Sequence, residues 1–199
     1  MSVPQTWSWA FVVAFVMIPG CSWLPHPVAY QDPLTAPEHM ALGESYVQQG
    51  HSDLASREFE AALKQQPNYV PAFVALGNLA FHNQSLTAAE FYYRRALELS
   101  PAHPVAANNL AMVYLSKEEK FDEVERLART ALQHESQLKP YILETLATLY
   151  LKQDKLIDAQ TVLEQADAIT PPTNTSLLTR LSQLRQELTK RWSRIPAQH

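Results

Sequence analysis

Few side chains in this chain of 199 residues are placed to carry out catalysis. Cys21 is the only thiol, and the seven histidines are spread along the sequence without an HExxH pattern. A nucleophilic site needs a serine or cysteine beside a base, and a metal site needs clustered ligands. The acidic pairs Glu118-Glu119 and Asp122-Glu123 fit a solvated turn between two helices better than a catalytic dyad. We therefore predict a protein that is not an enzyme and that needs no cofactor and no metal ion.

Cys21 stands directly after an apolar segment. The run WSWAFVVAFVMI, from Trp7 to Ile18, is largely apolar, and residues 1–20 contain no charged side chain. A helix that spans a bilayer needs about 20 apolar residues. The apolar region of a signal peptide is shorter, about 7–15 residues, and small residues come after it. Residues 1–20 are therefore predicted to be a signal peptide.

The segment Ile18-Pro19-Gly20-Cys21 resembles the lipobox of bacterial lipoproteins. The resemblance implies cleavage before Cys21, attachment of lipid to its sulfur, and a membrane anchor in the bacterial cell envelope. Under the sorting pattern of that family, Ser22 favours the outer membrane, with the protein facing the periplasm. Pro19 and the uncharged first residues depart from the family's pattern. The alternative is an ordinary signal peptide or an uncleaved anchor, in which Cys21 has no role.

Proline and glycine content predicts the structure of the chain after Cys21. Residues 21–35 contain prolines at 25, 27 and 33 and are predicted to form an extended tether. Beyond them, the rarity of glycine, with four in the chain against fourteen prolines, favours helices that stop and start at prolines. The net charge is −4, and the basic residues gather after Arg180, which leaves an acidic body. Because phosphate binding needs a basic face, no nucleic-acid partner is expected.

A motif of about 34 residues recurs along the rest of the chain. Leu42-Gly43 and Leu76-Gly77 lie 34 residues apart, and Leu110-Ala111 and Leu146-Ala147 occupy the same place in two further copies. Alanines and an aromatic or apolar residue follow at matching offsets in each copy: Ala55, Phe59 and Ala62; Ala89, Tyr93 and Ala96; Val124, Ala128 and Ala131; Ala159, Leu163 and Ala166. This pattern resembles the tetratricopeptide repeat (TPR) family.

The resemblance implies an all-α fold, a right-handed solenoid of helical hairpins with about four repeats. The predicted repeats span residues 36–69, 70–103, 104–139 and 140–171, and residues 172–199 are predicted to form a capping helix with a basic tail. Small residues such as Gly77 are expected where two helices approach closely. The basic face of the last helix is interpreted as solvated, since charged runs usually solvate helices.

The resemblance also implies where a partner binds. In this family the first helices of successive repeats line a concave groove that holds a protein or peptide. Amides at these positions can bond an extended backbone, and aromatic residues can receive apolar side chains. We expect Phe81 and Tyr141 to be the main anchors. The predicted groove residues are Asn78, Phe81, His82, Asn108, Asn109, Met112, Tyr141, Glu144 and Thr148.

These patterns indicate two alternative functions. The first is a lipid-anchored scaffold or assembly factor of the cell envelope, with an architecture that resembles pilotin-like lipoproteins and a membrane contact through Cys21. The alternative is a soluble periplasmic or secreted TPR adaptor that serves an export or polysaccharide system and carries no lipid. The identity of the partner is not encoded in any motif of the sequence.

Overall fold

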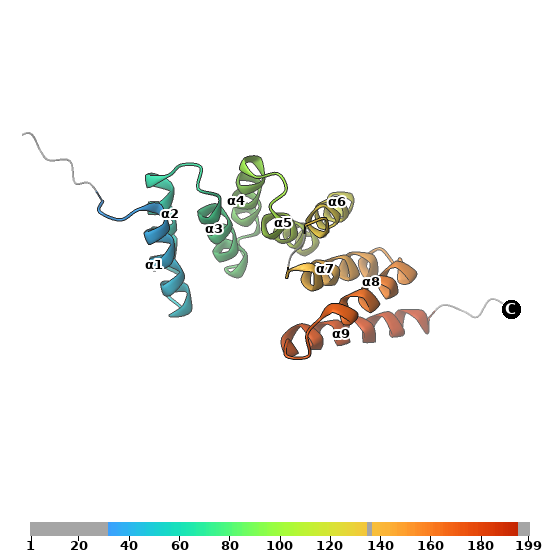
Figure 1. Ribbon diagram of the computed structural model, residues 1–199. Coiled ribbons are helices and arrows are strands. Elements are labelled where there is room, and N and C mark those ends of the chain that lie inside the picture. The colour runs from blue at the N-terminus through green and yellow to red at the C-terminus, as the bar shows by residue number, and fades with distance from the viewer. Residues whose placement is uncertain (1–31, 135–136, 195–199) are drawn as a thin grey trace, which may run out of the picture. The chain divides into compact units, whose positions relative to one another are not determined.

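The computed structural model describes residues 32–134 and 137–194. Cys21, the predicted signal peptide and most of the predicted tether lie outside this part of the chain. The described residues form nine α-helices and no strand (Figure 1). The helices are α1 (Ala36–Gln48), α2 (Ser52–Gln65), α3 (Val70–His82), α4 (Leu86–Leu99), α5 (Pro104–Lys117), α6 (Phe121–Leu132), α7 (Lys139–Lys152), α8 (Leu156–Ile169) and α9 (Thr175–Trp192).

The helices pack in the order of the chain. The tightest contacts join α1 to α2, α3 to α4, α5 to α6 and α7 to α8, so each of the four predicted repeats contains one packed pair. The second helix of each pair then contacts the first helix of the next pair, and α9 packs against both α7 and α8. The first helices α3, α5 and α7 also touch one another in sequence. This stacking places residues at equivalent offsets on neighbouring helices side by side.

Local sequence explains where the helices begin. Pro71, Pro104 and Pro140 lie in the first turn of α3, α5 and α7, where a missing backbone N–H costs little. Thr35 precedes α1, and its backbone N–H donates to the Glu38 carboxylate at 2.7 Å in a capping box. Asn174 accepts a bond from the backbone N–H of Leu177 at 3.3 Å and so caps α9.

The two helices of a repeat approach most closely at a glycine in the first two repeats. A Cβ atom added to Gly77 would lie 2.5 Å from the ring of Tyr93, and Gly43 faces the ring of Phe59 in the same way. In the third and fourth repeats the equivalent pairs are Ala111 with Ala128 and Ala147 with Leu163, all buried. A large ring is thus accompanied by glycine, and a smaller side chain by alanine. The alanine–leucine pair of the fourth repeat thus keeps about the volume of the glycine–aromatic pairs, as a close-packed interior favours, whereas the alanine–alanine pair of the third repeat is smaller.

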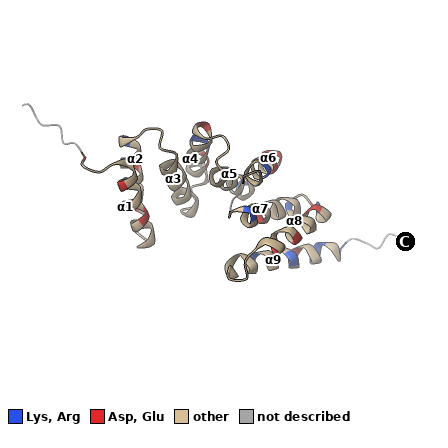
Figure 2. Cartoon of the chain, viewed as in Figure 1, with Lys and Arg blue, Asp and Glu red and all other residues tan. Residues whose placement is uncertain are grey.

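Charged residues are distributed unevenly over the helices. Helix α1 carries acidic residues and no Lys or Arg, whereas α9 carries four basic residues and one acid, Glu187 (Figure 2). No helix of the described residues is long and apolar enough to cross a membrane.

Candidate protein-binding groove

Two adjoining hollows lie along the first helices of repeats two to four. The first has a volume of about 480 Å³ and is lined by Asn78, Phe81, His82, Gln84, Tyr93, Asn109 and Met112. The second has a volume of about 260 Å³ and is lined by Met112, Leu115, Ser116, Glu144, Thr145, Thr148 and Lys152. Met112 borders both, so the two hollows form one continuous surface, which we call the groove.

Most of the residues predicted from sequence line the groove. These are Asn78, Phe81, His82, Asn109, Met112, Glu144 and Thr148. Asn108 and Tyr141 line neither hollow. Binding by any of these side chains remains a prediction, because the structure places them without a ligand.

Asn78 is held at the centre of the first hollow by two donors. The Tyr93 hydroxyl donates to Asn78 Oδ1 at 2.8 Å, and Asn109 Nδ2 donates to the same oxygen at 2.9 Å. Burial raises the pKa of Tyr93 well above its usual range, so its hydroxyl keeps the proton that it donates. With its oxygen occupied, Asn78 presents its amide N–H groups on an exposed surface. It is therefore oriented as a hydrogen-bond donor.

Asn108 is a buried link between α5 and α7. It is 5% exposed, and its Oδ1 accepts a bond from Thr145 Oγ1 at 2.9 Å. Asn108 was predicted to line the groove, but its side chain is buried between α5 and α7. Its neighbour Asn109, also predicted, does line the groove, because adjacent residues on a helix point about 100° apart.

Helix α9 contacts the fourth-repeat end of the groove. Arg180 of α9 makes a bidentate ion pair with Glu144, Nε to Oε1 at 2.6 Å and Nη2 to Oε2 at 3.0 Å. Asn174, just before α9, donates to the Tyr141 hydroxyl at 2.8 Å, and the Arg180 guanidinium lies 5.9 Å from the Tyr141 ring centroid. The interpretation of the basic face of α9 as merely solvated is thus corrected for Arg180, because this side chain pairs with α7.

These contacts leave the groove with little uncompensated charge. Arg180 neutralises Glu144, and the Lys152 ammonium donates to Glu118 at 2.6 Å. The remaining lining side chains are amides, hydroxyls and apolar groups, together with His82. The surface can therefore offer hydrogen bonds and apolar contacts, but no free carboxylate or ammonium.

Sequence reasoning did not single out several lining residues. Ser116 lies one helical turn after Met112, and Lys152 lies one turn after Thr148. Extending the i, i+4 pattern to the last turn of each helix would have found both. No spacing pattern indicated three further lining residues. Thr145 bonds Asn108, Gln84 lies in the turn after α3, and Tyr93 lies on α4, the second helix of its repeat.

The packed helix pairs and the spacing of the motif have a counterpart in a known family. Residues 40–104 match the family model described as a tetratricopeptide repeat. The TPR prediction is thereby confirmed for that region, and the consecutive packed pairs of the described helices are consistent with the predicted TPR solenoid. TPR repeats indicate a protein-interaction scaffold.

Part of the chain is also similar to a characterised protein. The chain is 33% identical over 91 residues to a peroxisomal targeting signal receptor of Pichia angusta. The match covers 39% of this chain and 16% of the relative, so most of the receptor has no counterpart in it.

Proposed function

We propose that this protein is an interaction scaffold that holds an extended segment of a partner protein in the groove. The observation that carries the proposal is the continuous surface on α3, α5 and α7, where oriented amides alternate with apolar side chains. Asn78 and Asn109 can bond the backbone of an extended chain, and Phe81 and Met112 can receive its side chains. The TPR match supports this role, since TPR proteins bind protein partners.

The charges of the groove favour an uncharged segment. Glu144 and Lys152 both have partners within the protein, so a charged ligand side chain would find no counterion without breaking an existing pair. Polar and apolar side chains meet no such cost. Binding energy should concentrate in a few anchors, and Phe81 is the aromatic side chain that lines the hollow at α3.

Photo-crosslinking tests the groove directly. A photoreactive amino acid at Asn109 should capture a partner in the cells that produce the protein, and the same group at Arg57, on the exposed side of α2, should not. The triple substitution Phe81→Ala, Asn109→Ala and Met112→Ala should abolish capture at a neighbouring groove position, Ser116. A control triple of Arg57→Ala, Lys64→Ala and Gln160→Ala should leave it intact. Capture that depends on the control residues instead would place the partner on the second helices.

We further propose that the scaffold is anchored in the bacterial cell envelope through lipid on Cys21. The support is the lipobox-like segment, which lies outside the described residues, and the predicted tether, most of which also lies outside them. Diacyl modification contributes about 0.8 kcal/mol per buried CH₂, enough for stable attachment when two or more chains insert. A role as an assembly factor at the outer membrane would follow. The unlipidated adaptor is the second candidate.

Metabolic labelling separates these two candidates. Cys21→Ser should abolish incorporation of labelled palmitate and move the protein from the membrane fraction to the soluble fraction. Cys21→Ser that stays in the membrane fraction would indicate an uncleaved signal anchor. A wild-type protein that takes up no label and is already soluble would favour the adaptor.

A further inference from the structure

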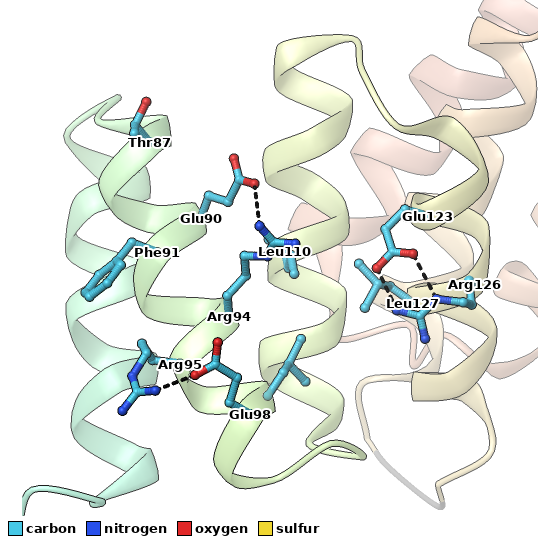
Figure 3. Close-up of a pocket in the computed structure, with 11 residues that line it drawn as sticks. Thr87, Glu90, Phe91, Arg94, Arg95, Glu98, Leu110, Glu123, Arg126 and Leu127 are labelled. Atoms are coloured by element: carbon cyan, nitrogen blue, oxygen red, sulfur yellow. Dashed lines mark hydrogen bonds and ion pairs between the residues drawn. The ribbon is translucent and has the colours of Figure 1, made fainter.

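A separate hollow lies between α4 and α6, and it shares no lining residue with the groove. Its volume is about 710 Å³. Leu97, Leu110 and Leu127 line it from three successive helices, α4, α5 and α6, and two of these leucines are buried. Figure 3 shows arginine and glutamate side chains of α4 and α6 around it. The hollow therefore combines an apolar floor with a charged rim.

The acidic side of this rim is already neutralised. The Glu90 carboxylate accepts bonds from Lys117 Nζ at 2.8 Å, Lys120 Nζ at 3.0 Å and the Tyr114 hydroxyl at 3.1 Å. Arg126 donates twice to Glu123, at 2.8 and 2.6 Å, and Arg95 pairs with Glu98. No carboxylate of the rim thus lacks a cationic partner.

Arg94 is the surplus cation of the rim. Its guanidinium lies 3.7 Å from Glu90, too far for a hydrogen bond, and the Glu90 oxygens are held by the three donors named above. Among residues 32–134 and 137–194, Arg94 has no hydrogen bond and no other ion pair. Its side chain is 60% exposed and lies at the hollow (Figure 3). Its parallel N–H donors are free to bind a carboxylate.

An exposed aromatic ring stands beside this cation. Phe91 is 57% exposed, although an aromatic ring gains from burial, and it lines the hollow on α4 with Arg94. Aromatic and arginine side chains are the residue types enriched at the energetic centres of protein interfaces. Their combination here marks a contact surface.

We propose that the hollow between α4 and α6 binds an acidic segment of a partner protein, which places an apolar side chain on the leucine floor and a carboxylate against Arg94. Charge complementarity selects this occupant. A basic segment would meet only glutamates that already have partners, and it would face Arg94, whose ion pair with Glu90 spans 3.7 Å. An acidic segment gains the guanidinium and breaks no hydrogen bond, because Glu90 keeps its three donors when Arg94 turns to a ligand. The chain would then hold two protein segments at once, one in the groove and one in the hollow between α4 and α6.

A pair of capped peptides tests the proposal. The first has a central leucine flanked by two aspartates on each side, and the second replaces the aspartates with asparagines. Titration of the first into the ¹⁵N-labelled full chain should shift amide signals of α4 and α6, around Arg94 and Arg126. Arg94→Gln should weaken this binding about fivefold, the upper range for an exposed ion pair. The asparagine peptide should bind no better to wild type than to Arg94→Gln.

A charge removed far from the hollow serves as the control. Arg57→Gln removes the same charge from an exposed site on α2 and should leave the affinity unchanged. The proposal fails if neither peptide shifts α4 and α6 signals, if the two peptides bind equally, or if the shifts fall on α3, α5 and α7. A second copy of the chain is the competing occupant. Sedimentation that shows a dimer of the wild-type chain, dissociated by Arg94→Gln, would overturn the proposal in favour of that copy.

Discussion

The hydroxyl of Tyr114 on α5 donates a hydrogen bond of 3.1 Å to the carboxylate of Glu90 on α4. The same contact recurs one repeat later, where the Tyr150 hydroxyl on α7 donates to Glu125 on α6 at 2.9 Å. Each bond joins the first helix of a repeat to the second helix of the repeat before it. A lysine ammonium also lies near each ring centroid, Lys120 at 4.3 Å and Lys155 at 5.8 Å. We call this contact the Tyr–Glu clamp.

The first junction has no Tyr–Glu clamp. In the register of the repeats, Ala80 stands where the later repeats have tyrosine, and Ser56 stands where they have glutamate. The apolar core nevertheless continues across this junction. Phe59 and Leu76 belong to a cluster of α1, α2 and α3, while the largest cluster extends from α4 to α9. The first repeat is therefore attached by apolar packing without this bond.

Glu90 should make stability depend on pH in the acid range. Although burial alone would raise its pKa, the bonds from Lys117, Lys120 and Tyr114 prevail and lower the pKa of Glu90 to about 2. The folded state thus binds a proton less readily than the unfolded state, so the stabilisation is complete above about pH 4.5 and is lost as pH falls from there toward 2. Glu90→Gln should cost about 1–3 kcal/mol at pH 7, measured by urea unfolding.

The pH series provides the check on Glu90. The difference between wild type and Glu90→Gln should shrink below pH 4.5, while Glu60→Gln, an exposed acid on α2, should show no such difference at pH 7. A constant penalty from pH 7 to pH 3 would mean that packing, and not charge, holds Glu90.

Hydrogen exchange should reveal the missing clamp. Amides of α1 and α2 should exchange faster than those of α5 to α8, because among the described helices the first repeat packs against the second repeat alone and has no Tyr–Glu bond. Tyr114→Phe should speed amide exchange at the junction of α4 and α5. Tyr150→Phe should do the same at the junction of α6 and α7. Equal protection of α1 and α5 in the wild type would contradict this account.

Transfer of the fourth-repeat residue pair into the second repeat should show that the two contacting side chains compete for space. Gly77→Ala places a methyl group against the Tyr93 ring and should cost about 1–3 kcal/mol of unfolding free energy. Adding Tyr93→Leu reproduces the alanine–leucine pair of the fourth repeat, Ala147 with Leu163. The double variant should be more stable than the sum of the two single effects, by about 0.5–3 kcal/mol. Strict additivity in thermal or urea unfolding would show that the two positions do not compete for space.

The repeat pattern was sufficient to predict the fold because it combines period and composition. Leucine, glycine or alanine, and an aromatic residue at fixed offsets predict helix pairs, and Pro71, Pro104 and Pro140 indicate helix starts. The close approach at Gly77 also followed from the alignment. The Tyr–Glu clamp did not, because Glu90 and Tyr114 belong to different repeats and only the packing brings them together.

The site was predicted to the level of the helix face and less well at single residues. Seven of the nine predicted side chains line the groove. Asn108 and Asn109 are adjacent amides, and the sequence did not distinguish the one that bonds Thr145 from the one that reaches the surface. Tyr141 and Glu144 were missed as partners of α9, because a charged helix end usually solvates. Alanine at Asn108 or Tyr141 would thus test packing rather than binding.

The Glu144–Arg180 pair should control both the docking of α9 and the charge of the groove. Arg180→Ala leaves the Glu144 carboxylate, 18% exposed, without its bidentate partner and should cost about 1–3 kcal/mol, while speeding amide exchange in α9. The groove would then carry an uncompensated negative charge, so crosslinking from Asn109 to an uncharged partner segment should fall. Arg180→Ala with Glu144→Gln removes that charge and should restore crosslinking without restoring the lost stability. Lys190→Ala, an exposed lysine on the same helix, should change neither quantity. Crosslinking that follows stability rather than charge across these variants would mean that α9 acts on the groove through packing alone.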